Sequence, residues 1–301
     1  MNRDQRHAAQ RLGDADLQVL KRDGVVIRPG FLSAEEILRV REITLRLRPT
    51  AEGHKNPARK LLLMTPFHGL RQSARASIRN DLVWLSRVAQ EGGFRDFARR
   101  FYAQDACLDH IVSIESPRSA DPITAWHADG SSAAESFTLK FFLYLKDIDA
   151  SAGAFSYLRG TNRPVTALRQ GIVRGTIAPF STGNVPELVK ALQTKEVVDY
   201  LRQQMSQLEA DEFARTVQMI DGDPAADLEV NSLSGVAGTL VVFDDRGLHR
   251  GGVPRLRERS TLRYNYVTTA YWRARSAHTP LWYARQRLSK AFLPKSIAAH
   301  W

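Results

Sequence analysis

The segment Gly238-Thr-Leu-Val-Val-Phe-Asp-Asp-Arg-Gly-Leu-His249 decides how the second half of this chain is expected to fold. Its first half is a short run of apolar and β-branched residues, which is typical of a buried strand. A polar turn follows, and the turn ends in a histidine. The segment therefore predicts a strand that delivers the His249 side chain to one end of a β-sheet.

Comparable β-rich runs, each bounded by turn residues, lie on both sides of this segment. Helical patterns dominate the chain before about Arg100, and the clearer ones cover residues 78–90 and 94–102. The β-rich runs, which begin after Leu108, are residues 111–115, 137–145, 154–158, 238–243 and 261–268. A β-sandwich or barrel backed by helices is the fold class that this order favours.

The start of the chain shows the same alternation on a small scale. Residues 17–22 are expected to end a helix at Gly24, and Val25-Val26-Ile27 is expected to form a short strand. Ser33 is a helix cap, and Glu36 stands where a capping box needs its carboxylate. We therefore expect a helix, a strand and a second helix in that order.

No internal repeat, low-complexity tract or long linker divides the sequence. We expect one domain over residues 1–301, with a helix-rich part over 1–107 and a β-rich core over 108–270. Within that core, residues 186–215 carry a loosely periodic apolar stripe. This stripe predicts one or two helices.

The composition is that of an ordinary globular protein, with 43% hydrophobic and 25% charged residues. The single cysteine, Cys107, allows neither an intramolecular disulfide nor a cysteine-based metal site, and its apolar setting favours a buried thiol. The first residues lack a targeting pattern, and no stretch has the length of a membrane span. We expect a cytoplasmic protein without stable membrane insertion.

The net charge of +11 comes from 43 Lys and Arg against 32 Asp and Glu. The basic residues are spread along the chain without a nucleic-acid-binding signature, so a solvated surface is favoured and nucleic acid is not an expected partner. The excess also suits an anionic small substrate. An alternative is an anionic-surface binder that uses residues 271–275 and 282–287, where aromatic and basic residues interleave.

The sequence Trp126-His127-Ala128-Asp129-Gly130 places an imidazole and a carboxylate on the same side of an extended segment. Such a pair alone is usually a surface hydrogen bond, but His249 could complete a set of three ligands. Two histidines and one carboxylate on one face of an octahedron suit Fe(II) and leave positions open, whereas zinc prefers a closed tetrahedral set. The predicted metal ligands are His127, Asp129 and His249.

Cations follow the second histidine in the stretch 254–266. A dicarboxylate co-substrate such as 2-oxoglutarate needs a guanidinium for the carboxylate that does not bind the metal. The candidates are Arg255, Arg257, Arg259 and Arg263. Lys140 shares one face of the strand 137–145 with Tyr144, and it is a weaker candidate for binding the co-substrate.

Most of the chain resembles the phytanoyl-CoA dioxygenase family. The resemblance is carried by residues 23–33, which match the opening strand and helix start, by residues 126–130, and by residues 145–154. It is also carried by Arg159-Gly-Thr-Asn-Arg163, in which Asn162 replaces the usual histidine. The order of these motifs agrees with that of the family.

The resemblance implies a double-stranded β-helix, the jelly-roll or cupin-like fold, with N-terminal helices. It places His249 on the distal iron ligand and Arg259 on the 2-oxoglutarate arginine, with Arg263 as the alternative. The long separation of the two histidines leaves residues 171–231 as a helical insertion in the core, and residues 271–301 as a C-terminal extension.

The resemblance further implies Fe(II), 2-oxoglutarate and O2 as cofactors and hydroxylation of an unactivated C–H bond of a small substrate, with release of succinate and CO2. Because Asp129 keeps the carboxylate that halogenating relatives lack, hydroxylation is favoured over halogenation. Desaturation, epimerisation and cyclisation use the same cofactors and stay open. An alternative of another class is a non-catalytic binding protein with the same fold.

Overall fold

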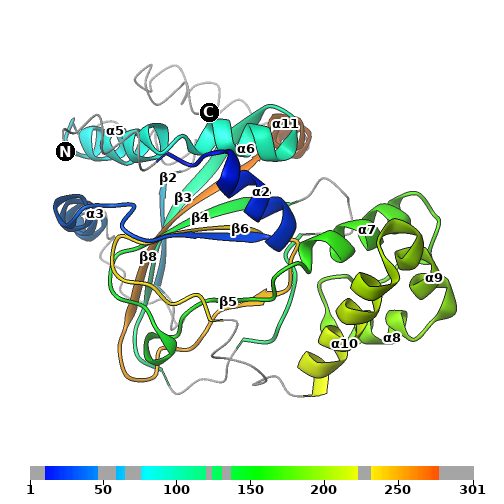
Figure 1. Cartoon of the computed structure of the whole chain (residues 1–301). Coiled ribbons are helices and arrows are strands. Elements are labelled where there is room, and N and C mark those ends of the chain that lie inside the picture. Colours follow the sequence, from blue (N-terminus) through cyan, green and yellow to red (C-terminus); the bar gives the residue numbers. More distant parts are fainter. Residues whose placement is uncertain are drawn as a thin grey trace.

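Six antiparallel strands form the main sheet, in the order β1-β6-β4-β8-β3-β2 (Figure 1). The computed structural model describes residues 11–46, 59–64, 76–119, 124–130, 137–222 and 232–277. The strands of the main sheet are β1 (Val25–Arg28), β2 (Arg59–Met64), β3 (Ala106–Ser116), β4 (Leu139–Tyr144), β6 (Leu240–Asp244) and β8 (Arg259–Thr268). A second, two-stranded sheet pairs β5 (Ser156–Tyr157) with β7 (His249–Arg250).

Each of the five β-rich runs predicted from the sequence overlaps an observed strand. Strands β2 and β7 were not predicted. β7 is only two residues long, which is too short to show the alternation that identifies a strand in a sequence. The expected fold class, mainly β with flanking helices, is confirmed.

Helices of the first part of the chain cover one face of the main sheet (Figure 1). They are α2 (Asp14–Asp23), α3 (Ala34–Arg46), α5 (Ala76–Glu91) and α6 (Phe94–Tyr102), and α11 (Thr269–Ala277) follows β8. The predicted capping box begins α3, because the Ser33 N–H donates to Glu36 Oε2 at 2.8 Å and the Glu36 N–H donates to Ser33 Oγ at 3.3 Å. Gly24 ends α2 in the left-handed conformation, at φ 75°.

Aromatic side chains join these helices to the sheet. Phe94 of α6 stacks on Phe141 of β4 with ring centroids 4.4 Å apart, and it meets Tyr264 of β8 edge to face at 5.4 Å. Leu262, Tyr264 and Tyr266 all belong to this buried cluster. Since alternate residues of a strand point to opposite faces, Arg259, Thr261 and Arg263 are left on the other face of β8.

Four helices between β5 and β6 form a separate group beside the sheet, at the right of Figure 1. They are α7 (Asn162–Val173), α8 (Val185–Leu192), α9 (Lys195–Gln204) and α10 (Gln207–Gly222). The helices expected within 186–215 are therefore three, and the helical segment begins at Asn162 instead of 171. Residues 223–231 of the predicted insertion lie outside the described residues.

The helical group has a hydrophobic core of its own, which also contains Trp126, Ala128 and Leu248. These three residues alternate with His127, Asp129 and His249 along their two segments. The core of the insertion therefore supports the segments that carry the predicted metal ligands.

Two further expectations concern Cys107 and the end of the chain. Cys107 is buried against Val267 and Trp272, as predicted. Residues 278–301, which include the basic and aromatic stretch 282–287, lie outside the described residues. Among the helices that the structure does describe, none combines the length and the apolar character that crossing a membrane requires.

Candidate metal centre

Backbone hydrogen bonds bring the two histidine segments together. The His127 N–H donates to the His249 carbonyl oxygen at 3.0 Å, and the His249 N–H donates to the His127 carbonyl oxygen at 2.8 Å. The Asp129 N–H donates to the carbonyl oxygen of Asp245 at 2.8 Å. Residues that are far apart in the sequence thus become direct neighbours through main-chain pairing.

The side chains of His127, Asp129 and His249 converge on one point. His127 Nε2 lies 3.7 Å from Asp129 Oδ1, and His249 Nε2 lies 3.5 Å from Asp129 Oδ2. One ligand atom from each residue lies within 4.8 Å of the other two. Atoms that bind one metal ion at about 2.1 Å are separated by roughly 3 to 4 Å, so the three side chains could hold a metal ion with little adjustment.

The imidazole rings present the nitrogen that a metal needs. Nδ1 of His127 lies 2.9 Å from the Ala125 carbonyl oxygen, and Nδ1 of His249 lies 2.8 Å from the Gly247 carbonyl oxygen. Because a carbonyl oxygen only accepts, each Nδ1 carries the proton and each Nε2 has a free lone pair directed toward Asp129. The backbone therefore selects the tautomer that binds metal.

The charges around His249 and Asp129 favour the protonation states that bind a metal ion. Burial lowers the pKa of His249, and the charge of Lys140 and the ring of His127 lower it further, against the effect of Asp129. Burial alone would raise the pKa of Asp129, but the contact with His249 and the charge and hydrogen bond of Lys140 outweigh burial and hold that pKa well below its ordinary value. At neutral pH the site thus offers a neutral imidazole and a carboxylate.

Lys140 lies on β4 behind this carboxylate. Its Nζ donates to Asp129 Oδ2 and lies 3.5 Å from Asp245 Oδ2. Burial raises the pKa of Asp245 to about 6, and Lys140 opposes that shift. The ammonium group of Lys140 is therefore held between Asp129 and Asp245. The weaker candidacy of Lys140 for binding the co-substrate stays a prediction.

The three converging side chains open into a cavity of about 320 Å³ on the face of the sheet that the N-terminal helices do not cover. Its aromatic walls include Phe142, Tyr144, Phe155 and Phe243. The polar residues that line it are Thr124, His127, Asp129, Lys140, His249, Arg259, Thr261 and Arg263. The predicted ligands and two of the four candidate arginines thus share one cavity.

Arg259 is anchored at one side of this cavity. Its Nη1 donates to the carbonyl oxygens of Gly153 and Gly252, and its Nη2 lies 3.3 Å from Ser116 Oγ. A guanidinium has five N–H donors, so one donor on Nε and one on Nη2 are left for a ligand. Two neighbouring donors of this kind suit a single carboxylate.

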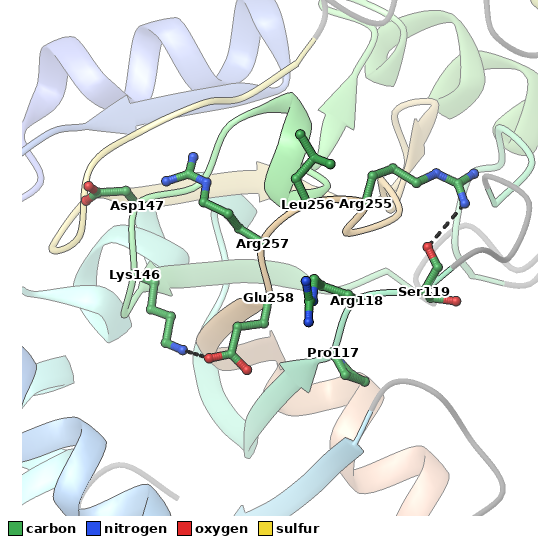
Figure 2. Close-up of a pocket in the computed structure, with 9 residues that line it drawn as sticks. All are labelled: Pro117, Arg118, Ser119, Lys146, Asp147, Arg255, Leu256, Arg257 and Glu258. Atoms are coloured by element: carbon green, nitrogen blue, oxygen red, sulfur yellow. Dashed lines mark hydrogen bonds and ion pairs between the residues drawn. The ribbon is translucent and has the colours of Figure 1, made fainter.

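The other two candidate arginines point elsewhere. Arg255 and Arg257 line a different hollow of about 1080 Å³, which Figure 2 shows, and none of the three converging side chains reaches it. In this hollow Arg255 Nη1 donates to the Ser119 carbonyl oxygen at 3.2 Å, and Lys146 pairs with Glu258. Arg257 pairs with Asp149. Arg255 and Arg257 therefore lie outside the cavity of the metal centre.

One contributor to the site was missed in the sequence. Arg169 of α7 is fully buried, and its Nη2 donates to the carbonyl oxygen of Asp129 at 2.7 Å. Its Nε donates to Thr182 Oγ1 at 2.9 Å. Because Arg169 sits in a helix far along the chain from Asp129, no local pattern could have indicated this contact.

His110 is the third histidine in the described part of the chain. It lies on β3 with Nδ1 2.6 Å from Asp109 Oδ2 and with Nε2 against Asn265. It does not belong to the group of His127, Asp129 and His249.

Comparisons with known proteins agree with this fold. No family model matches the chain. The curated protein Dioxygenase hkm4 of Aspergillus hancockii is 27% identical over 168 residues, which cover 50% of this chain and 54% of that protein. The match thus spans about half the length of the relative.

HygX from Streptomyces hygroscopicus has been solved with nickel and 2-oxoglutarate bound, and it is similar to this chain at 15% identity and a TM-score of 0.50. That match covers 86% of this chain and 88% of HygX. The apo structure of HygX gives a TM-score of 0.51 over the same shares. The expected jelly-roll core with flanking helices is thereby confirmed as the fold of this chain.

Proposed function

We propose that this protein is an Fe(II)- and 2-oxoglutarate-dependent oxygenase of the phytanoyl-CoA dioxygenase type, which hydroxylates an unactivated C–H bond of a small substrate. The observation that carries the proposal is the convergence of His127, Asp129 and His249 on one point of a cavity that also contains Arg259. The fold that the chain shares with HygX and the partial match to Dioxygenase hkm4 support it.

The donor set fits Fe(II) better than a structural zinc ion. Two imidazoles and one carboxylate on one side leave the other positions of an octahedron open toward the cavity, whereas structural zinc is enclosed by four protein ligands. The hydrogen bonds to Ala125 and Gly247 leave both Nε2 atoms facing the metal position, and Asp129 is ionised at neutral pH.

Arg259 would hold the co-substrate through its distal carboxylate. Its guanidinium is held in place by Gly153, Gly252 and Ser116, and it keeps two donors for a ligand. Such an arrangement restricts the side chain before the ligand arrives, which reduces the entropy lost on binding. The distal carboxylate of 2-oxoglutarate matches these two donors.

When iron and 2-oxoglutarate are bound, they supply the oxidising chemistry, in which O2 gives one oxygen atom to the substrate and one to the succinate formed with CO2. The protein's own residues orient the reactants and exclude water. Phe142, Phe155 and Phe243 form apolar walls beside the ligands. Asp129 occupies the position that a halide needs in halogenating relatives, which supports hydroxylation. The lone buried cysteine fits a reducing, cytoplasmic setting.

Succinate release with Fe(II), 2-oxoglutarate and a metabolite library tests the proposal, with mass spectrometry to detect a gain of one oxygen atom. We expect substrate-dependent succinate from the unmodified protein and none from Asp129→Asn. Asp149→Asn is the matched control, because Asp149 is an exposed carboxylate paired with Arg257 at the surface.

The co-substrate role of Arg259 is tested separately. Arg259→Gln should raise the 2-oxoglutarate concentration needed for half-maximal turnover while iron binding stays unchanged, and Arg257→Gln should change neither. Succinate production at the normal rate by the Asp129→Asn protein would refute the proposed function.

A further inference from the structure

A second arginine faces the cavity from the same strand as Arg259. Arg263 lies four residues further along β8 and therefore on the same face, and it lines the cavity together with the three predicted ligands. In the sheet it pairs with Phe142 of β4, and Lys140 pairs with the next residue of that face, Asn265. Diagonal neighbours of this kind lie roughly 7 to 8 Å apart. Arg263 is thus close to Lys140, whose ammonium group contacts Asp129.

The guanidinium of Arg263 forms no ion pair within the described part of the protein. The Nε atom of Arg263 is buried and has no hydrogen-bond partner in that part. The guanidinium carbon lies 5.8 Å from the centre of the Phe142 ring. Burial lowers the pKa of Arg263, against the more distant charges of Asp129, Asp245 and Asp109. An arginine stays protonated in such a setting, so the cavity contains a partly buried charge without an ion-pair partner among the described residues.

The two other cations that line the cavity are already engaged. Lys140 contacts Asp129 and lies close to Asp245, and Arg259 is held by two carbonyl oxygens with donors left for one carboxylate. A divalent metal ion and the dianion 2-oxoglutarate cancel each other's charge. The carboxylates of Asp129 and Asp245 balance the charges of Lys140 and Arg259. Among the cations that line the cavity one positive charge then remains, and Arg263 is the one without an ion pair.

Withdrawing an uncompensated charge even partly from water costs free energy unless a ligand supplies the opposite charge. We propose that Arg263 binds an anionic group of the organic substrate, a carboxylate or a phosphate, and so holds that substrate beside the metal centre. This inference rests on the proposed function and deepens it, because it names the class of substrate. The cavity of about 320 Å³ further implies that a small anion, or the charged end of a larger one, enters it.

Arg263 could instead bind the distal carboxylate of 2-oxoglutarate, and a comparison of matched variants separates the two roles. Arg263→Gln and Arg259→Gln each replace one guanidinium by a neutral amide, and Arg263→Lys keeps the charge. Calorimetry on the Ni(II)-loaded proteins measures the affinity for 2-oxoglutarate. We expect Arg259→Gln to weaken it by about 10-fold or more and Arg263→Gln to change it by less than about 2-fold. The reverse order would overturn the inference.

Inorganic sulfate is the probe for the anion site itself. We expect the unmodified protein loaded with Ni(II) and 2-oxoglutarate to bind sulfate, Arg263→Gln to lose this binding, and Arg263→Lys to keep part of it. Equal sulfate affinities of the unmodified protein and Arg263→Gln would overturn the inference. The thermal midpoint of Arg263→Gln should equal or exceed that of the unmodified protein, since the substitution removes a partly buried charge that has no ion pair among the described residues. This midpoint also shows that the variant folds.

The same probe distinguishes failure of the inference from failure of the proposed function. If neither Ni(II) nor 2-oxoglutarate binds, the proposed function fails, and sulfate binding to the metal-free protein still reports on Arg263. If the metal-free protein binds sulfate and Arg263→Gln does not, the anion site at Arg263 is supported. If both bind sulfate equally, the inference is overturned.

Once turnover is found, carboxylate substrates and their neutral primary amides complete the test. The unmodified protein should favour the carboxylate by about 10-fold or more in kcat/KM, and Arg263→Gln should lose that preference. An equal preference in both proteins would overturn the inference.

Discussion

The two faces of the main sheet differ sharply although neighbouring residues of the same strands form them. On the face covered by α5 and α6, Phe141, Tyr264 and Tyr266 are buried in an aromatic cluster. On the opposite face, Lys140 and Arg263 come directly before Phe141 and Tyr264 in the sequence, and they line the cavity. The period of two along a strand thus separates residues that stabilise the fold from residues that we propose for chemistry.

This difference has an energetic meaning. The helix-covered face has ring contacts and apolar burial, which stabilise the folded state. The cavity face has buried charges that cost free energy unless ligands or counter-charges meet them. Substitutions on the first face should therefore lower stability, and substitutions on the second should lower ligand affinity with little loss of stability.

The largest effect is expected for Phe141→Ala. Removing this ring from its contacts with Phe94 and Tyr266 should lower the free energy of unfolding by about 3 to 5 kcal/mol, as measured by denaturant titration. Phe142→Ala is the matched control on the cavity face, where the side chain is only half-buried, and it should cost less. Equal losses for the two neighbours would contradict the distinction between the faces.

His249→Ala should act on the cavity face. Loss of a ligand should weaken Fe(II) binding by about 100-fold or more, since losing a group that merely orients a ligand already costs about 10- to 100-fold. Anaerobic titration with Fe(II) measures this affinity. His110→Ala is the control, because His110 lies outside the ligand group. Unchanged iron affinity in the His249→Ala protein would remove the metal centre from this face.

Arg169→Met tests whether the helical insertion also contributes to the cavity face. The substitution keeps most of the apolar stem and removes the hydrogen bond to the Asp129 carbonyl oxygen. We expect Fe(II) affinity to fall by about 10-fold. Arg163→Met of the same helix, whose side chain pairs with Glu209 at the surface, should leave the affinity unchanged. If both variants bind iron normally, the insertion has no role in placing Asp129.

Two tyrosines of β8 give the smallest effect and the closest control. Tyr264 Oη donates to the Leu85 carbonyl oxygen at 2.9 Å, so Tyr264→Phe should lower the free energy of unfolding by about 1 kcal/mol. The buried hydroxyl of Tyr266 has no hydrogen-bond partner among the described residues, so Tyr266→Phe should cause no loss. Thermal unfolding of both variants compares them, and a greater loss in Tyr266→Phe would be the opposite of what we expect.

The sequence predicted the β-rich core well because strands such as β4 and β8 are long enough to show their alternation and their apolar character. The capping box of Ser33 and Glu36 was predictable for a similar reason, since both partners lie within one helical turn. Strand β7 escaped prediction because its two residues pair through the backbone alone, whatever their side chains are.

The three converging side chains were predictable from residue types and from the family resemblance, and their convergence required the structure. The resemblance suggested both Arg259 and Arg263, and the bonds of Arg259 to Gly153 and Gly252 distinguish it from Arg263. The contact between Arg169 and Asp129 depends on how the helical group packs, and packing between distant segments leaves no local pattern in a sequence.

The reciprocal main-chain hydrogen bonds between His127 and His249 have a consequence for how proteins of this fold can vary in length. Main-chain pairing sets the separation of the two ligands without regard to what lies between them in the chain. Lengthening a loop whose ends are already held costs little, about 0.6 kcal/mol for each doubling. Segments of very different size can therefore be accommodated between these two positions, and the helical group from α7 to α10 is one of them.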